Sequence, residues 1–70
     1  MRADLIRMAN QIARQFEHLP ADAAATAVAG HLRLFWTPAM RAELVAGVTE
    51  DPDPYHPAVI AAAALTPTGT

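Results

Sequence analysis

The 70-residue sequence contains no cysteine and no lysine, and only four of its residues are aromatic. The absence of cysteine excludes disulfide bonds, thiolate metal ligands and a cysteine nucleophile. Its five cationic side chains, all arginines, are outnumbered by seven acidic ones, so the net charge of −2 is unsuited to coating a phosphate backbone. The longest apolar run, Ala58 to Leu65, is far too short to span a membrane. We therefore expect a cytoplasmic protein that binds neither nucleic acid nor membrane.

Large apolar side chains are also scarce. Hydrophobic residues make up 53% of the chain, but 17 of them are alanines. A chain of this length forms one small domain and buries a smaller share of its surface than a typical domain does. The side chains large enough to anchor a core are Leu5, Ile6, Phe16, Leu32, Phe35, Trp36, Leu44 and Ile60. Contact with a partner surface would therefore help to stabilise the chain.

The first segment has the pattern of an amphipathic helix from about Asp4 to His18, ended by Pro20. Its apolar residues recur at steps of three and four, as one helix face requires: Leu5, Met8, Ile12, Phe16 and Leu19.

The second segment begins at Asp22, which we expect to cap a helix that runs towards Trp36. Val28, Leu32 and Phe35 mark its apolar face. Gly30 lies within it, and close packing of another backbone would explain a glycine there.

A third helix is predicted to begin at Thr37 and Pro38, because the hydroxyl can cap it and proline fits the first helical position. It places Met40, Leu44 and Val48 on one side, with Arg41 opposite, and ends near Gly47.

The composition changes after residue 48. Residues 49–57 hold three prolines and three acids, which favours an extended, solvated linker, and residues 58–66 are predicted to form a short helix. Residues 67–70 should be a frayed tail. The fold class is therefore all-α: a helical core over residues 1–48 with three amphipathic helices, the linker, and a short C-terminal helix.

No residue pattern indicates catalysis or metal binding. His18, His31 and His56 are too far apart in sequence to form a helical metal pair, and the acidic residues are expected on the solvated surface. We expect no catalytic, cofactor-binding or metal-binding residue in this chain.

The stretch "RLFWTPAMR", residues 33–41, is the strongest candidate site. Adjacent positions on a helix point about 100° apart, so Phe35 and Trp36 cannot both face one narrow core. One ring is expected in the core and the other against a partner, since tryptophan and arginine are enriched at binding hot spots. Arg33 and Arg41 could clamp a carboxylate beside them.

The same residues resemble the delta subunit family of NAD-dependent, molybdenum-containing formate dehydrogenases. The family's first pattern, Leu-x-x-Met-Ala-Asn-Gln-Ile, is met by Leu5, Met8, Ala9, Asn10, Gln11 and Ile12. Its second, Phe-Trp-x-Pro-x-Met-Arg, is met by Phe35, Trp36, Pro38, Met40 and Arg41. The resemblance covers residues 4–48 and continues loosely into the last predicted helix.

This resemblance implies a non-catalytic accessory subunit of a cytoplasmic complex that oxidises formate with NAD. The role implied is assembly, stability or molybdenum cofactor insertion of the large subunit. In such a complex the molybdenum cofactor, iron–sulfur clusters, FMN and NAD are held by the large subunit and the flavin- and NAD-binding subunits, and none by this chain. The docking surface on the large subunit is predicted to include Met8, Asn10, Gln11, Arg33, Trp36, Pro38, Met40 and Arg41.

Two alternatives remain open from the sequence. One is a small helical nucleic-acid-binding or regulatory module of the antitoxin kind, using Arg33 and Arg41 at a short helix–turn–helix, although the net charge argues against it. The other is a transient chaperone that leaves the enzyme after cofactor insertion.

Overall fold

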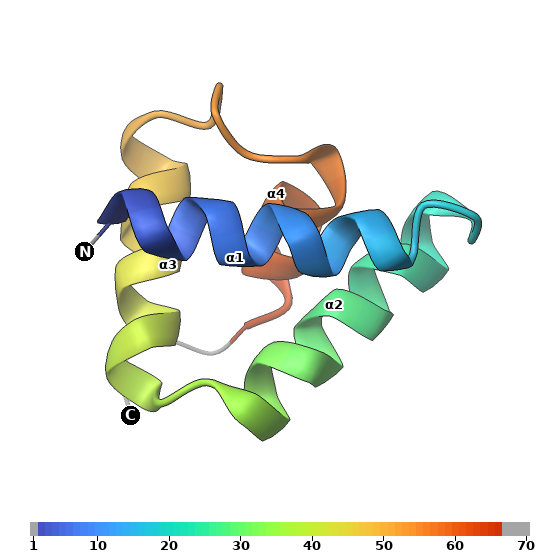
Figure 1. The fold of residues 1–70 in the computed structure, drawn as a ribbon, viewed down its shortest axis with the longest axis horizontal. Coiled ribbons are helices and arrows are strands. Elements are labelled where there is room, and N and C mark those ends of the chain that lie inside the picture. Colours follow the sequence, from blue (N-terminus) through green and yellow to red (C-terminus); the bar gives the residue numbers. More distant parts are fainter. Residues whose placement is uncertain (1, 67–70) are drawn as a thin grey trace.

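The computed structural model describes residues 2–66 and, within that range, contains four α-helices and no strand. The helices are α1 (Arg2–Gln15), α2 (Ala21–Phe35), α3 (Pro38–Glu50) and α4 (Pro57–Ala64). α1 crosses in front of α4, whereas α2 and α3 diverge from a sharp turn (Figure 1). α4 packs chiefly against α2. The predicted all-α class is therefore confirmed, and the tail predicted over residues 67–70 lies outside the described residues.

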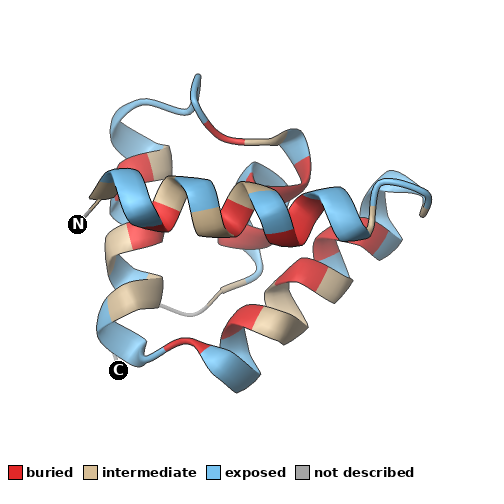
Figure 2. Cartoon of the chain, in the orientation of Figure 1, coloured by how far each residue is buried: buried red, intermediate tan, exposed pale blue. Residues whose placement is uncertain are grey.

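The core lies where the four helices converge, and the buried positions of each helix face it (Figure 2). Four of the expected anchors, Leu5, Leu32, Trp36 and Leu44, are buried there. Small side chains supply much of the remainder and let the helices approach closely. The full cluster is Leu5, Ala9, Ile12, Ala13, Ala24, Val28, Leu32, Trp36, Leu44, Tyr55, Ala58, Val59 and Ala62.

Helix boundaries differ from the expected ones by a few residues. α1 ends at Gln15 rather than His18, because the next main-chain bonds tighten to three-residue turns, such as Leu19 N to Phe16 O at 3.0 Å. Asp22 lies inside the first turn of α2 rather than capping it, and its carboxylate accepts from the N–H of Ala23 at 2.9 Å.

The start of α3 follows the prediction. Thr37 Oγ1 accepts the main-chain N–H of Met40 at 3.1 Å, and Pro38 occupies the first turn, where no donor is needed. α3 then continues to Glu50, past the predicted end at Gly47.

Gly47 is needed for side-chain packing and not for ending the helix. A Cβ at this position would overlap the hydroxyl of Tyr55 and lie 3.2 Å from its Cζ atom. Tyr55 is thereby seated against α3 with only 5% of its surface exposed. The expectation of a solvated linker over residues 49–57 is therefore wrong at Tyr55. The ring packs into the space that Gly47 of α3 leaves open.

Gly30 does not serve close packing. A Cβ there would meet no atom within 4 Å beyond its own helix backbone and chain neighbours. The expectation of a close backbone approach at Gly30 is therefore wrong.

None of the helices in the described part of the chain is both long and apolar enough to cross a membrane.

Candidate docking surface

The two adjacent aromatic residues point in different directions, as expected, but the structure assigns them the reverse of the predicted roles. Trp36 is only 6% exposed and belongs to the core, whereas Phe35 is 71% exposed. The chain leaves the α2 helix at Trp36, which has φ −100° and ψ 147°, so helical spacing no longer sets the direction of its side chain. Trp36 therefore contributes to the fold and presents little surface to a partner.

Arg41 also serves the fold. Its Nη1 donates to the main-chain oxygen of Trp36 at 2.5 Å, with longer contacts of 3.4 Å to the oxygens of Leu32 and Arg33. These oxygens lie at the end of α2, where a cation is favoured, and Leu32 O also accepts the main-chain N–H of Trp36 at 2.9 Å. Arg41 therefore fastens the start of α3 to the end of α2.

Asn10 is a third predicted docking residue that bonds within the chain. Its Nδ2 donates to Pro54 O at 2.9 Å, and its Oδ1 accepts the N–H of His56 at 2.9 Å. His56 in turn caps α4 through Nδ1, which accepts from Ala58 N at 3.0 Å, while its Nε2 lies 2.8 Å from Glu17. Asn10 thus holds the segment before α4 against α1.

An open groove remains between α1, the end of α2 and the start of α3. It has a volume of about 350 Å³ and brings together four predicted residues, Met8, Gln11, Trp36 and Met40. Ile12, Gln15, His31 and Phe35 complete its lining. We call these eight residues the Phe35 groove.

His31 and Phe35 form one wall of the Phe35 groove. Their rings lie 4.6 Å apart between centroids and are tilted by 38°. Among residues 2–66, His31 Nδ1 is the one buried side-chain nitrogen or oxygen without a hydrogen-bond partner. An unpaired buried polar atom is costly, so the histidine is incompletely satisfied within the chain itself.

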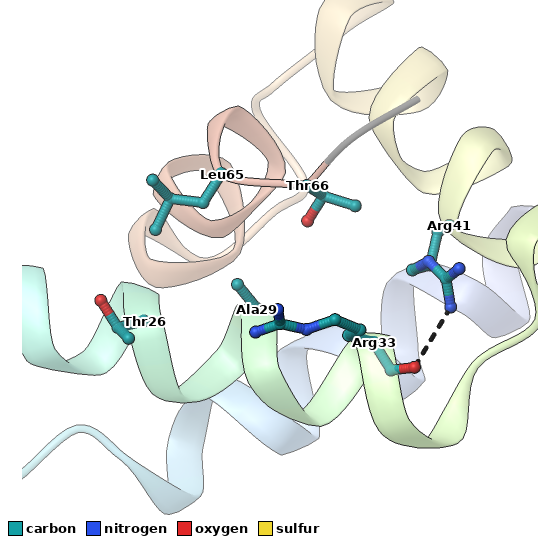
Figure 3. Close-up of a pocket in the computed structure, with 6 residues that line it drawn as sticks. All are labelled: Thr26, Ala29, Arg33, Arg41, Leu65 and Thr66. Carbon is teal, nitrogen blue, oxygen red and sulfur yellow. Dashed lines mark hydrogen bonds between the residues drawn. The ribbon is translucent and has the colours of Figure 1, made fainter. Parts of the chain in front are cut away.

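The other predicted residues lie elsewhere. Arg33 and Arg41 line a second pocket between α2 and the end of α4 (Figure 3). Pro38 is exposed in the first turn of α3. We call this second pocket the arginine pocket. Of the eight predicted residues, four therefore line the Phe35 groove, two line the arginine pocket, and Asn10 and Pro38 line neither.

The exposure of Phe35 was not predicted from the sequence, nor was the presence of Gln15 and His31 in the lining of the Phe35 groove. The signal available was the run of three large apolar residues, Leu34 to Trp36, which cannot all face inward. Leu34 is 78% exposed beside Phe35. Large apolar side chains exposed together are typical of interaction sites.

Two titratable side chains in the described residues, Arg2 and Tyr55, have shifted pKa values. No group of three histidine or acidic side chains there could hold a metal ion. The Arg2 guanidinium lies 3.0 Å from a carboxylate oxygen of Glu50 and 2.7 Å from one of Glu43, and so joins α1 to α3. Hydrogen bonds to these two carboxylates raise the pKa of Arg2. Burial raises the pKa of the Tyr55 phenol. These shifts follow from packing and ion pairing.

Residues 2–66 thus form a small all-α protein fold of four helices, with an open apolar groove and an arginine-lined pocket. The chain belongs to the family described as NADH-dependent formate dehydrogenase delta subunit FdsD, whose family model matches residues 4–63. The family resemblance drawn from the two sequence patterns is therefore confirmed, and membership implies a place in a multi-subunit formate dehydrogenase. Neither the comparison with curated proteins nor that with solved structures gives a match.

Proposed function

We propose that this chain is a non-catalytic accessory subunit of a cytoplasmic NAD-dependent formate dehydrogenase, and that it docks on the large molybdenum-containing subunit. The observation that carries the proposal is the family match over residues 4–63. The role is support of assembly, stability or molybdenum cofactor insertion. In this proposal the molybdenum cofactor, iron–sulfur clusters, FMN and NAD lie in the other subunits.

The Phe35 groove is the proposed docking surface. Phe35 is a large ring that this fold leaves 71% exposed, beside an apolar floor that includes Met8 and Met40. Where an aromatic residue anchors an interface, its burial typically contributes about 2 kcal/mol or more to the binding free energy. His31, with its unpaired Nδ1, adds a polar group for which a partner could provide a hydrogen bond.

Purification through a tag on this chain tests the proposal. The expected result is co-elution of the large subunit and the flavin- and NAD-binding subunits, with formate-dependent reduction of NAD in the same fractions. Recovery of this chain without any formate dehydrogenase subunit would refute the proposal.

Stoichiometry and metal content then separate the possible roles. A permanent subunit is expected at one copy for each large subunit in the active enzyme. An assembly factor is expected only with large subunits that lack molybdenum. If the complex made without this chain has normal yield, stability and molybdenum content, the accessory role is excluded.

A further inference from the structure

The arginine pocket is distinct from the Phe35 groove and lies between α2 and the end of α4. It has a volume of about 360 Å³. Its lining is Thr26, Ala29, Arg33, Arg41, Leu65 and Thr66. Figure 3 shows the Arg33 side chain extended along α2 towards Ala29, with the Arg41 guanidinium near the end of the same helix.

Positive charge in this pocket is not balanced within the described residues. The pocket lining includes two guanidinium groups and no carboxylate. The ion pairs formed by arginines in residues 2–66 use Arg2 and Arg7, so neither pocket arginine has an acidic partner there. This local charge contrasts with the net charge of −2 of the whole chain.

The two arginines retain donors for a ligand. The hydrogen bonds of Arg41 in the described part of the chain all use Nη1, which leaves its Nε and Nη2 groups available. The side chain of Arg33 makes no hydrogen bond to another described residue. By contrast, Thr26 and Thr66 donate their hydroxyl protons to the carbonyl oxygens of Asp22 in α2 and Ala62 in α4, at 3.0 and 2.8 Å. Recognition of an anion here therefore depends on the guanidinium groups.

We infer that the arginine pocket binds a carboxylate side chain of a partner protein, from a segment that also places an apolar side chain against Leu65. Planar guanidinium groups match the geometry of a carboxylate and favour it over a neutral group. Leu65 is 55% exposed and Ala29 adds apolar surface, which suits a peptide segment better than a small inorganic anion. The inference rests on the proposed function, with the formate dehydrogenase complex supplying the acidic segment.

A charge reversal with a matched control tests this inference. Arg33→Glu places a negative charge in the pocket at an exposed position. Arg14→Glu makes the same change in charge at an exposed residue of α1 that lines neither the arginine pocket nor the Phe35 groove. Binding of each purified variant to the formate dehydrogenase complex made without this chain is measured at low and high salt, with helicity recorded as a check on folding.

The inference predicts that Arg33→Glu weakens binding at least about tenfold relative to Arg14→Glu, because a paired charge is replaced by a repulsive one. It also predicts that the wild-type chain loses affinity with salt more steeply than Arg33→Glu does. At equal ionic strength, phosphate should weaken the binding of the chain to the complex no more than chloride does.

Equal binding by the two variants would overturn the inference while leaving the proposed function intact. Preferential competition by phosphate would assign the pocket to a free anion, and a salt-sensitive dimer of the isolated chain abolished by Arg33→Glu would assign it to a second copy. Either result also overturns it. Failure of the wild-type chain to bind the complex would instead overturn the proposed function and the inference together.

Discussion

Arg41 Nη1 donates to the main-chain oxygen of Trp36 at 2.5 Å, which joins the first turn of α3 to the residue at the end of α2. Both residues belong to the pattern by which the sequence resembles its family. Their contact is internal, so this part of the pattern preserves the angle between two helices. The groove beside it, with Phe35 exposed, is thereby given its shape.

Replacing Arg41 by alanine is expected to lower the free energy of unfolding by about 1–3 kcal/mol, because carbonyl oxygens at the end of α2 lose a charged donor. Urea unfolding followed by circular dichroism measures the change. Arg33→Ala is the control, and a change within about 0.5 kcal/mol is expected since Arg33 is exposed. Equal losses for the two variants would show that Arg41 does not fasten the helices.

The two helical glycines are expected to respond oppositely to alanine. Gly47→Ala should destabilise the protein by about 1–3 kcal/mol, because its Cβ overlaps the ring of Tyr55. Gly30→Ala should stabilise it by about 0.5–1 kcal/mol, because the site is open and alanine favours the helix. Thermal unfolding of both variants measures the difference. A melting temperature of Gly47→Ala above that of the wild type would contradict the close packing of Tyr55 against Gly47.

Adding Tyr55→Phe to Gly47→Ala should reduce the penalty of the glycine substitution, because the overlapping hydroxyl is removed. Relief should be incomplete, since Cζ of the ring still lies 3.2 Å from the new Cβ. A double-mutant cycle on unfolding free energies measures this coupling. Strictly additive effects would mean that the ring and the glycine do not meet.

Asn10→Ala should release the segment before α4 and lower the unfolding free energy by about 1–3 kcal/mol, because two hydrogen bonds are lost. Hydrogen exchange of the His56 amide should also become faster. Gln11→Ala, on the exposed side of the same helix, should leave both quantities unchanged. Unchanged exchange at His56 in Asn10→Ala would rule out this anchoring role.

Stability should fall in alkaline solution because burial raises the pKa of Tyr55 above its ordinary value of 10.0. Above that value the unfolded chain loses the phenol proton while the folded chain still holds it. The unfolded state then binds fewer protons, so the unfolding free energy decreases as pH rises towards the folded pKa. Urea unfolding from about pH 8 to about pH 11 should show a shallower decrease in Tyr55→Phe, and identical slopes would exclude Tyr55 as the cause.

The predictable part of the fold was local. Apolar spacing identified the first helix, and the hydroxyl of Thr37 followed by Pro38 located the start of α3. These signals depend on neighbours in sequence, which is why they could be found without a structure.

The remaining features depend on contacts between distant residues. Tyr55 is buried because Gly47 leaves room for it, although prolines and acids surround the tyrosine in sequence. Trp36 enters the core because the chain bends at the end of α2, where helical periodicity no longer applies. Trp36, which was predicted to dock, is therefore buried, whereas the adjacent ring of Phe35 is exposed.

The most direct measurement is the affinity of the purified chain for the formate dehydrogenase complex made without it, compared for wild type, Phe35→Ala and Ile60→Ala. Ile60 is 36% exposed and lies on α4, outside the Phe35 groove. The account predicts binding of the wild-type chain, at least about tenfold weaker binding by Phe35→Ala, and near-wild-type binding by Ile60→Ala. Equal affinities for wild type and Phe35→Ala, with both folded, would contradict docking through the Phe35 groove.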